Sequence, residues 1–238
     1  MSNKLVIGDV VIDVVQKDVK NIHLSVKPPS GVVTISAPLH VSDNAIRAFA
    51  IGKLKWIKQQ QVKLQSQVRE APREYIERES HYVWGRRCLL EIKEHDASPR
   101  VQLNHQKLTL FVRSNTLSET RGEIIERWYR EQLREAVLPL VDQWQLKIGV
   151  KLERLHVQRM KTRWGSCNNA RRSIRLNTDL AKKPPECLEY ILVHELVHLI
   201  EPQHDAKFVA MMDKLLPSWP HRRDQLNQLP VRHSDWEY

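Results

Sequence analysis

The stretch Ile191–Ile200 reads ILVHELVHLI and is the most informative part of this 238-residue sequence. It contains the pattern H-E-x-x-H, in which His194 and His198 stand four residues apart. Four residues make about one turn of an α-helix, so both imidazoles project from one face and can share a metal ion. Glu195 lies beside them and can reach a metal-bound water without ligating the metal, which is the position of a general base.

The residues around this pattern predict a buried helix. Apart from the two histidines and the glutamate, every residue of the stretch is apolar. Pro184 and Pro185 favour a helix start and Pro202 favours its end, which predicts a helix over residues 184–200. Two histidines and a glutamate inside such a helix are costly unless something compensates them. A metal ion does so most economically, and the alternative is a pair of hydrogen-bonded core histidines.

A hydrolytic zinc site usually has three protein ligands and a water molecule. His204 is the best third candidate, because the chain can turn after Pro202, and Asp213 is a weaker competitor. The resulting spacing is that of the metzincin proteases, but Glu201 stands where those proteins have glycine, so the turn must differ. The carboxylates of Glu201 and Asp205 are candidates for orienting the imidazoles, or are simply exposed acids.

A basic segment precedes the helix and leads into the predicted strand 173–177. In zinc peptidases a substrate commonly lies extended along such a strand and uses backbone hydrogen bonds. That geometry predicts Lys161 or Arg163 near the site, where a cation can stabilise an oxyanion. The alternative is a solvated basic turn.

The rest of the chain reads as alternating groups of strands and helices. Strands are predicted at 10–15, 21–26, 32–36, 83–93, 100–103, 107–112, 152–158 and 173–176, and helices at 45–67, 117–146 and 205–216, besides 184–200. Pro139 is expected to kink or break the helix 117–146. The predicted class is α+β, with an N-terminal β-rich region and basic helix over residues 1–115 and a catalytic domain over residues 116–238.

Composition indicates a folded globular protein, since apolar residues make up 41% of the chain and seven are tryptophan. No run of 18 or more apolar residues occurs, which argues against a transmembrane span. Asp9 and Asp13 interrupt the apolar stretch at the N-terminus, so no signal peptide is expected and the cytoplasm is the predicted location. Cys88, Cys167 and Cys187 are widely spaced, which predicts reduced thiols.

The net charge of +10 is unevenly distributed. Residues 151–183 carry ten basic side chains against Glu153 and Asp179, and the predicted helix 45–67 is rich in lysine. Such surfaces attract polyanions, so DNA is a candidate partner through these two segments. A merely solvated basic face is the alternative. Trp164 in the first segment could stack on bases, although a buried tryptophan is the more usual finding.

Several motifs together resemble a known family, the YgjP-like metallopeptidases, which are relatives of the SprT-like proteases. The matching stretches are M-K-T-R-W-G-S-C at 160–167, I-R-L-N at 174–177, and H-E-L-V-H at 194–198 with His204 and Phe208. The resemblance is strongest over about residues 150–220. It implies a zincin-like catalytic domain, one zinc ion held by His194, His198 and His204, and Glu195 as general base. SprT-like relatives act on proteins bound to DNA.

The sequence therefore predicts a zinc-dependent metallopeptidase of the H-E-x-x-H type that acts on protein or peptide substrates. The alternative is a DNA-associated protein whose zinc is structural, or whose protease activity is recruited by DNA. A closed four-ligand site would favour a structural zinc, but no fourth ligand is evident near His204.

Overall fold

A computed structural model describes residues 2–27, 30–66 and 69–230 of the chain. The chain forms two compact units that divide between Arg69 and Glu70. Each unit has its own hydrophobic core. The predicted boundary between residues 115 and 116 lies inside the second unit, and the division into an N-terminal region and a peptidase domain at that point stays a prediction.

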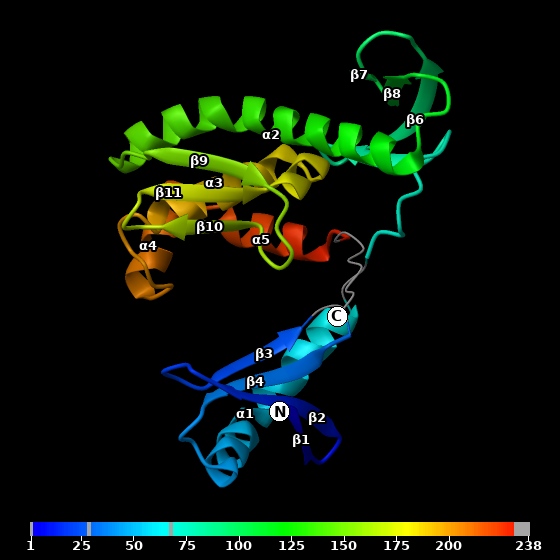
Figure 1. The fold of residues 1–238 in the computed structure, drawn as a ribbon. Helices are drawn as coiled ribbons and strands as arrows, with labels where there is room; N and C mark the ends of the chain where they lie inside the picture. The colour runs from blue at the N-terminus through cyan, green and yellow to red at the C-terminus, as the bar shows by residue number, and fades with distance from the viewer. Residues whose placement is uncertain (1, 28–29, 67–68, 231–238) are drawn as a thin grey trace. The chain divides into compact units, whose positions relative to one another are not determined.

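The first unit is a four-stranded sheet with one helix (Figure 1). Its elements are β1 (Ser2–Ile7), β2 (Val10–Lys17), β3 (His23–Lys27), β4 (Val32–Pro38) and α1 (Asp43–Ser66). The strand order is β1-β2-β4-β3, with β2 parallel to β4. Every second residue of β2 and β4 is buried in a core shared with α1, as the period of a one-sided sheet requires. Ser42 caps α1, since its Oγ accepts a hydrogen bond from Ala45 N at 3.4 Å.

The second unit opens with another four-stranded sheet, in the order β5-β6-β8-β7. Its strands are β5 (Ser80–Val83), β6 (Arg86–Glu94), β7 (Arg100–Asn104) and β8 (Lys107–Val112). Strand β6 confirms the strand predicted at 83–93 from residue 86 onward, but its predicted start is wrong, because a tight turn at Trp84 and Gly85 separates β5 from β6. Both turn residues have positive φ, 50° and 78°. The hairpin turn predicted at 104–106 is confirmed.

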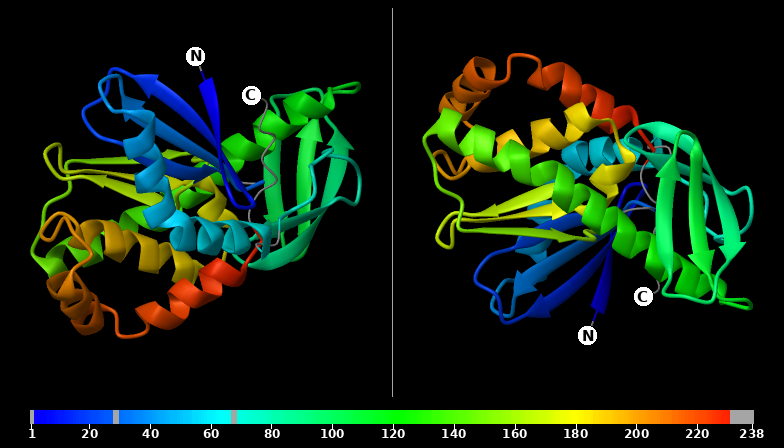
Figure 2. Two further views of the ribbon diagram at one scale, coloured as in Figure 1. Left: turned by 90° about the horizontal axis from the view of Figure 1, so that it is seen from below. Right: turned by 90° about the horizontal axis from the view of Figure 1, so that it is seen from above.

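The long helix α2 (Ser118–Ile148) packs against the sheet β5–β8 and against the second sheet of this unit (Figure 2). The predicted kink or break at Pro139 is wrong, since one continuous helix includes that residue. Gly149 ends the helix in the left-handed conformation, with φ 78°, and its N–H donates to the Gln145 carbonyl. Trp128 and Trp144 bury their rings on the inner face of the helix.

The candidate site lies on a small three-stranded sheet and the helices beside it. The strands are β9 (Arg154–Gln158), β10 (Gly165–Asn168) and β11 (Ser173–Asn177), in the order β10-β11-β9. A 3₁₀ turn, η1 (Thr178–Lys182), leads to α3 (Pro185–Val197), followed by α4 (Ala206–Leu215) and α5 (Trp219–Gln228). Helix α3 packs on β10 and β11. The predicted α+β class is confirmed, and the helix that carries the H-E-x-x-H pattern packs on a small sheet.

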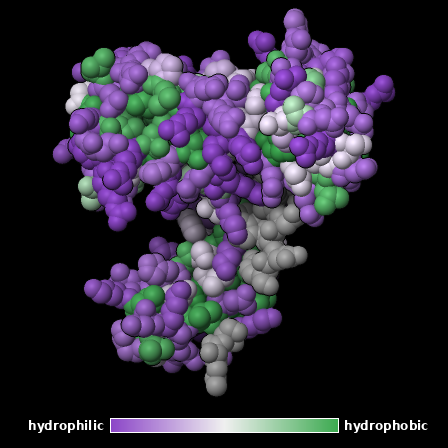
Figure 3. Space-filling view, turned by 45° about the horizontal axis from the view of Figure 1, so that its top comes forward, coloured by the Kyte–Doolittle hydropathy of each residue, from purple (hydrophilic) through white to green (hydrophobic). Residues whose placement is uncertain are grey.

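Five elements were not predicted: β1, β5, β10, η1 and α5. Strand β10 contains glycine, serine, cysteine and asparagine, which carry little strand propensity, and it forms because β11 pairs with it. The space-filling view shows mostly polar side chains with apolar patches between them (Figure 3). No helix in the described ranges is long and apolar enough to cross a membrane.

Candidate metal centre

Helix α3 carries three of the four predicted site residues. Its apolar residues are buried, and Glu195 is only 6% exposed, while His194 and His198 are half-buried. His198 directly follows the last helical residue but keeps helical dihedral angles, φ −61° and ψ −18°. Both imidazoles therefore remain on one face, with ring centroids 4.8 Å apart.

His204 reaches these two rings from the segment between α3 and α4. Its Nε2 lies 3.0 Å from His194 Nε2 and 3.1 Å from His198 Nε2. The three candidate ligand atoms all lie within 4.8 Å of one another, and in the described part of the chain no other group of His, Cys, Asp or Glu side chains does so. Zn–N bonds of about 2.0–2.1 Å separate tetrahedral ligands by roughly 3.3 Å, so the three residues fit a zinc-sized ion.

A backbone carbonyl orients His198. Its Nδ1 lies 3.0 Å from the carbonyl oxygen of Glu201, to which a protonated Nδ1 donates, leaving the Nε2 lone pair for a metal. The Glu201 carboxylate was one candidate for orienting an imidazole, and the structure uses the main-chain carbonyl of Glu201 instead. Asp205 has another role, because its Oδ1 caps α4 by accepting from the N–H groups of Lys207 and Phe208.

Asp213 is not part of the cluster. Its Oδ1 accepts a hydrogen bond of 2.8 Å from Trp219 Nε1, which ties α4 to the start of α5. Of the two candidates for the third ligand, the structure thus brings His204 to the other histidines.

The ring of Phe208 packs against all three imidazole rings. Its ring centroid lies 4.9 Å from that of His194 and 4.7 Å from those of His198 and His204. The side chain is 3% exposed and belongs to the core. Phe208 therefore packs in the core and against the three candidate ligand rings.

Burial keeps the histidines in the form that binds metals. It lowers the pKa of His194 to about 3, with further lowering from His198 and His204. The pKa of His198 is also lowered, mainly by burial. A metal ligand must be a neutral imidazole, so the pocket needs no deprotonation step at neutral pH.

Glu195 has an unusual environment for a carboxylate. Burial raises its pKa to about 7, against a smaller lowering by the Arg163 guanidinium. Its carboxylate lies against Gly165 of β10, where a Cβ built on that glycine would stand 2.6 Å from Glu195 Oε1. An acid with a pKa near neutrality is well suited to take and return a proton.

A cavity of about 400 Å³ joins these groups. Its lining residues are Arg163, Gly165, Ser166, Cys167, Asn169, His194, Glu195, His198, Pro202 and His204. Of the two cations considered from the sequence, Arg163 lines this cavity and Lys161 does not. A larger open hollow of about 1600 Å³ lies at β6 and the β7–β8 turn, away from the histidines.

The strand that borders the cavity differs from the predicted one. Strand β11, at 173–177, is central in its sheet and pairs with β10 on one side and β9 on the other. Both of its edges are therefore occupied, and it cannot receive an extended peptide. Strand β10 is one of the two edge strands of this sheet, and its residues 165–167 line the cavity.

Asn177 fixes the loop that carries Arg163. Its Nδ2 donates to the carbonyls of Met160 and Arg163, both at 2.9 Å. Its Oδ1 accepts from Met160 N and Asp179 N at 3.4 and 3.1 Å. All four hydrogen-bonding positions of this buried amide are used. Sequence reasoning missed this role, although an asparagine at the end of a buried strand is a signal for it.

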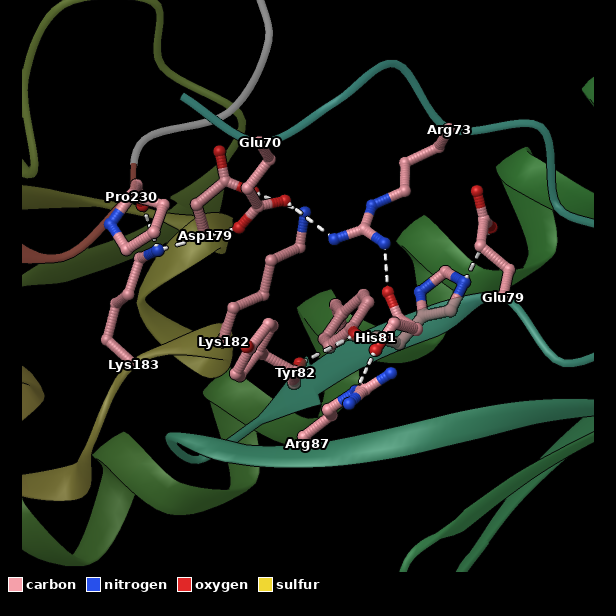
Figure 4. A network of polar contacts seen from close by, with 12 residues as sticks. Glu70, Arg73, Glu79, His81, Tyr82, Arg87, Asp179, Lys182, Lys183 and Pro230 are labelled. Atoms are coloured by element: carbon pink, nitrogen blue, oxygen red, sulfur yellow. Dashed lines mark hydrogen bonds and ion pairs between the residues drawn. The ribbon is translucent and has the colours of Figure 1, made fainter. Parts of the chain in front are cut away.

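Two lysines of the basic segment 151–183 are buried and do not contribute to the protein surface. Lys182 and Lys183 are 6% and 4% exposed and belong to a buried polar network (Figure 4). Lys182 pairs with Asp179 at 2.8 Å and Lys183 with Glu70 at 3.6 Å. The other basic residues of 151–183 are exposed or half-buried. No finding supports DNA as a partner, and that expectation stays a prediction.

The states of the three cysteines and of Trp164 agree with what the sequence predicted. Cys88, Cys167 and Cys187 are all free thiols. Trp164 is half-buried and packs against the core, with Lys183 Nζ 5.8 Å from its ring centroid. No observation gives Trp164 a stacking role on bases.

Comparison with protein families gives one match, to the family described as "YgjP-like, metallopeptidase domain", over residues 20–229. That range includes every residue of the candidate site and reaches back into the first unit. Among curated proteins no match is found.

Seven chains of solved structures match, and two are archaeal metallopeptidase zymogens. Abylysin of Pyrococcus abyssi is 21% identical with a TM-score of 0.36, covering 38% of this chain and 90% of its own. Jannalysin of Methanocaldococcus jannaschii is 20% identical with a TM-score of 0.34, covering 40% and 88%. Similarity at this level carries no conclusion about activity.

Proposed function

The chain belongs to the YgjP-like metallopeptidase family, and we propose that it is a zinc-dependent peptidase with Glu195 as its general base. The convergence of three imidazole nitrogens beside one buried carboxylate carries the proposal. His194, His198 and His204 would hold the zinc ion. Among the described residues the cluster has three members, as expected of a catalytic site that keeps one position open.

When bound, zinc supplies Lewis-acid chemistry, which acidifies water and polarises a carbonyl group. Glu195 would accept a proton from the attacking water on a carboxylate oxygen and return it to the leaving amine nitrogen. Its raised pKa allows both transfers near neutral pH. Arg163 is the cation best placed to stabilise a developing negative charge, since it lines the same cavity.

The substrate class that fits this site is an extended peptide. Strand β10 contributes residues 165–167 to the cavity lining, pairs with β11 along one edge, and within the described residues has no strand partner along its other edge. A peptide added to that edge would form backbone hydrogen bonds and place its carbonyl groups near the histidines. This arrangement favours unfolded segments of proteins over small molecules.

The decisive experiment is Glu195→Gln in the full chain. We expect zinc content, measured by mass spectrometry, to stay at about one ion per chain, because the change leaves all three ligands in place. Cleavage of an unfolded protein such as denatured casein should fall by about 10²–10⁴-fold, the usual contribution of a general base.

Glu186→Gln is the matched control, since Glu186 lies in the exposed first turn of the same helix and makes no contact with the cavity. It should cleave like the wild type. Undiminished cleavage by Glu195→Gln would rule out the proposed role of Glu195. Absence of zinc from the wild-type chain, even after zinc is supplied, would rule out the metal site.

A further inference from the structure

Gly165 lies in strand β10, and its backbone conformation does not require a glycine. The glycines with positive φ are Gly8, Gly31, Gly85 and Gly149, and Gly165 is not among them. Glycine inside a strand is less favourable than alanine, because it loses more conformational freedom on folding. Any residue could adopt this backbone conformation, so another constraint must account for the glycine.

That constraint is the space occupied by Glu195. A Cβ added at Gly165 would stand 2.6 Å from Glu195 Oε1, 2.8 Å from its Cγ and 3.0 Å from its Cδ. The contact with Cγ matters most, because rotating the carboxylate alone would not relieve it. Glu195 is also 6% exposed, so its side chain has little room to move elsewhere.

We propose that Gly165 is a positioning residue: its missing side chain lets the Glu195 carboxylate lie against strand β10 and face the three histidines. The proposed role of the glycine is to leave room for Glu195, and it acts through that side chain rather than through a side-chain contact of its own with metal or substrate. The inference rests on the proposed function for its catalytic consequence, whereas the contact itself can be tested without any activity measurement.

The first test is a thermal-unfolding cycle on the full-length, zinc-loaded chain. Gly165→Ala should lower the melting temperature by roughly 2–8 °C, the usual effect of overpacking a buried site. In a Glu195→Ala background the crowded atoms are gone, so the same glycine change should lower it by less than about 1 °C. An equal fall in both backgrounds would overturn the inference. If Gly165→Ala alone does not fold, recovery of folding in the double variant is the supporting result and failure to recover the opposing one.

The second test is kinetic and asks whether the base is displaced. Gly165→Ala should lower kcat by about 10²-fold with zinc content and KM unchanged, since a shift of about 1 Å in a catalytic group has that effect. Glu195→Asp shortens the side chain and withdraws it from the strand. In that background the glycine change should lower kcat by less than about 3-fold. A full 10²-fold loss there would contradict a steric role.

Two glycines serve as controls. A Cβ at Gly52, an exposed position inside α1, would meet nothing within 4 Å, so Gly52→Ala should not lower the melting temperature, should raise it slightly as alanine does inside a helix, and should leave kcat unchanged. A Cβ at Gly122, in α2, would stand 2.7 Å from a Tyr75 ring atom, so Gly122→Ala should lower melting temperature but not kcat. If the wild-type chain has no peptidase activity, the proposed function is refuted. If the wild-type chain is active and the Gly165→Ala variant has the same melting temperature and kcat, this inference is refuted.

Discussion

Helix α3 lies between two clusters of ionisable side chains that differ in how their charges are compensated. Just before it, the buried lysines Lys182 and Lys183 pair with Asp179, Glu70 and Glu126. At its other end, three histidines face one another, and their nearest polar contacts at Nε2 are each other. The charges of the lysine cluster are neutralised by ion pairs within that cluster. The histidine cluster has no such internal ion pairs among the described residues.

The comparison separates a structural cluster from a ligand site. Buried charges that are matched by opposite charges hold elements together and need nothing further. In the histidine cluster, burial lowers the pKa values of His194 and His198, so these two imidazoles are neutral at neutral pH and can present nitrogen lone pairs to a metal ion. Such an arrangement is suited to receive a metal ion, and substitutions in the two clusters should therefore have different consequences.

The largest expected effect is at His204. His204→Ala removes one of three ligands, so we expect zinc affinity to fall by more than about 100-fold, since even residues that only orient a ligand contribute 10–100-fold. Peptidase activity should fall with zinc occupancy. Competition with a chelating dye measures the affinity. Asp213→Asn is the control and should keep zinc, and loss of zinc there with retention in His204→Ala would reverse the ligand assignment.

Removing a charge from the lysine cluster should lower the free energy of unfolding without changing zinc binding. Lys182→Met leaves Asp179, which is 8% exposed by side chain, without its 2.8 Å partner. Loss of one member of a buried pair typically lowers the free energy of unfolding by about 3–5 kcal/mol. Urea unfolding measures it, and the folded variant should bind zinc normally. Lys151→Met breaks the exposed pair with Glu153 and should change little.

The next effect is on stability as a function of pH in the metal-free chain. The folded state raises the pKa of Glu195 from 4.5 to about 7, so burial of its charge destabilises the protein above pH 7 and not below pH 4.5. Glu195→Gln should therefore be more stable than wild type by up to about 3 kcal/mol at pH 8. The difference should vanish as pH falls to 4.5. A difference that is constant with pH would refute this titration.

The smallest effect concerns the loop beside the metal centre. Asn177→Asp has the same shape but loses both donors to the carbonyls of Met160 and Arg163. We expect unfolding free energy to fall by about 2 kcal/mol and kcat to fall, with zinc content unchanged. Asn104→Asp, in an exposed hairpin turn, is the isosteric control. Unchanged kcat in Asn177→Asp would separate this loop from catalysis.

Much of the site was predictable because its signals are local. His194, Glu195 and His198 lie within five residues of one helix, and helical geometry alone brings them to one face. The apolar residues around them indicated burial, and Pro202 made a turn toward His204 reasonable. The long helix 117–146 was equally clear from its periodicity. Strand β10 was not, because its residues have low strand propensity and its pairing partner decides its conformation.

The sequence by itself determined the metal-binding pattern, the buried helix that carries it and the α+β class. Tertiary structure decided which strand borders the cavity, which carbonyl orients His198, and why residue 165 is glycine. Those features depend on contacts between residues far apart in the chain, such as Gly165 with Glu195 and Asn177 with Met160. Periodicity and spacing describe neighbours along the chain, whereas steric fit and hydrogen-bond satisfaction arise only when distant segments meet.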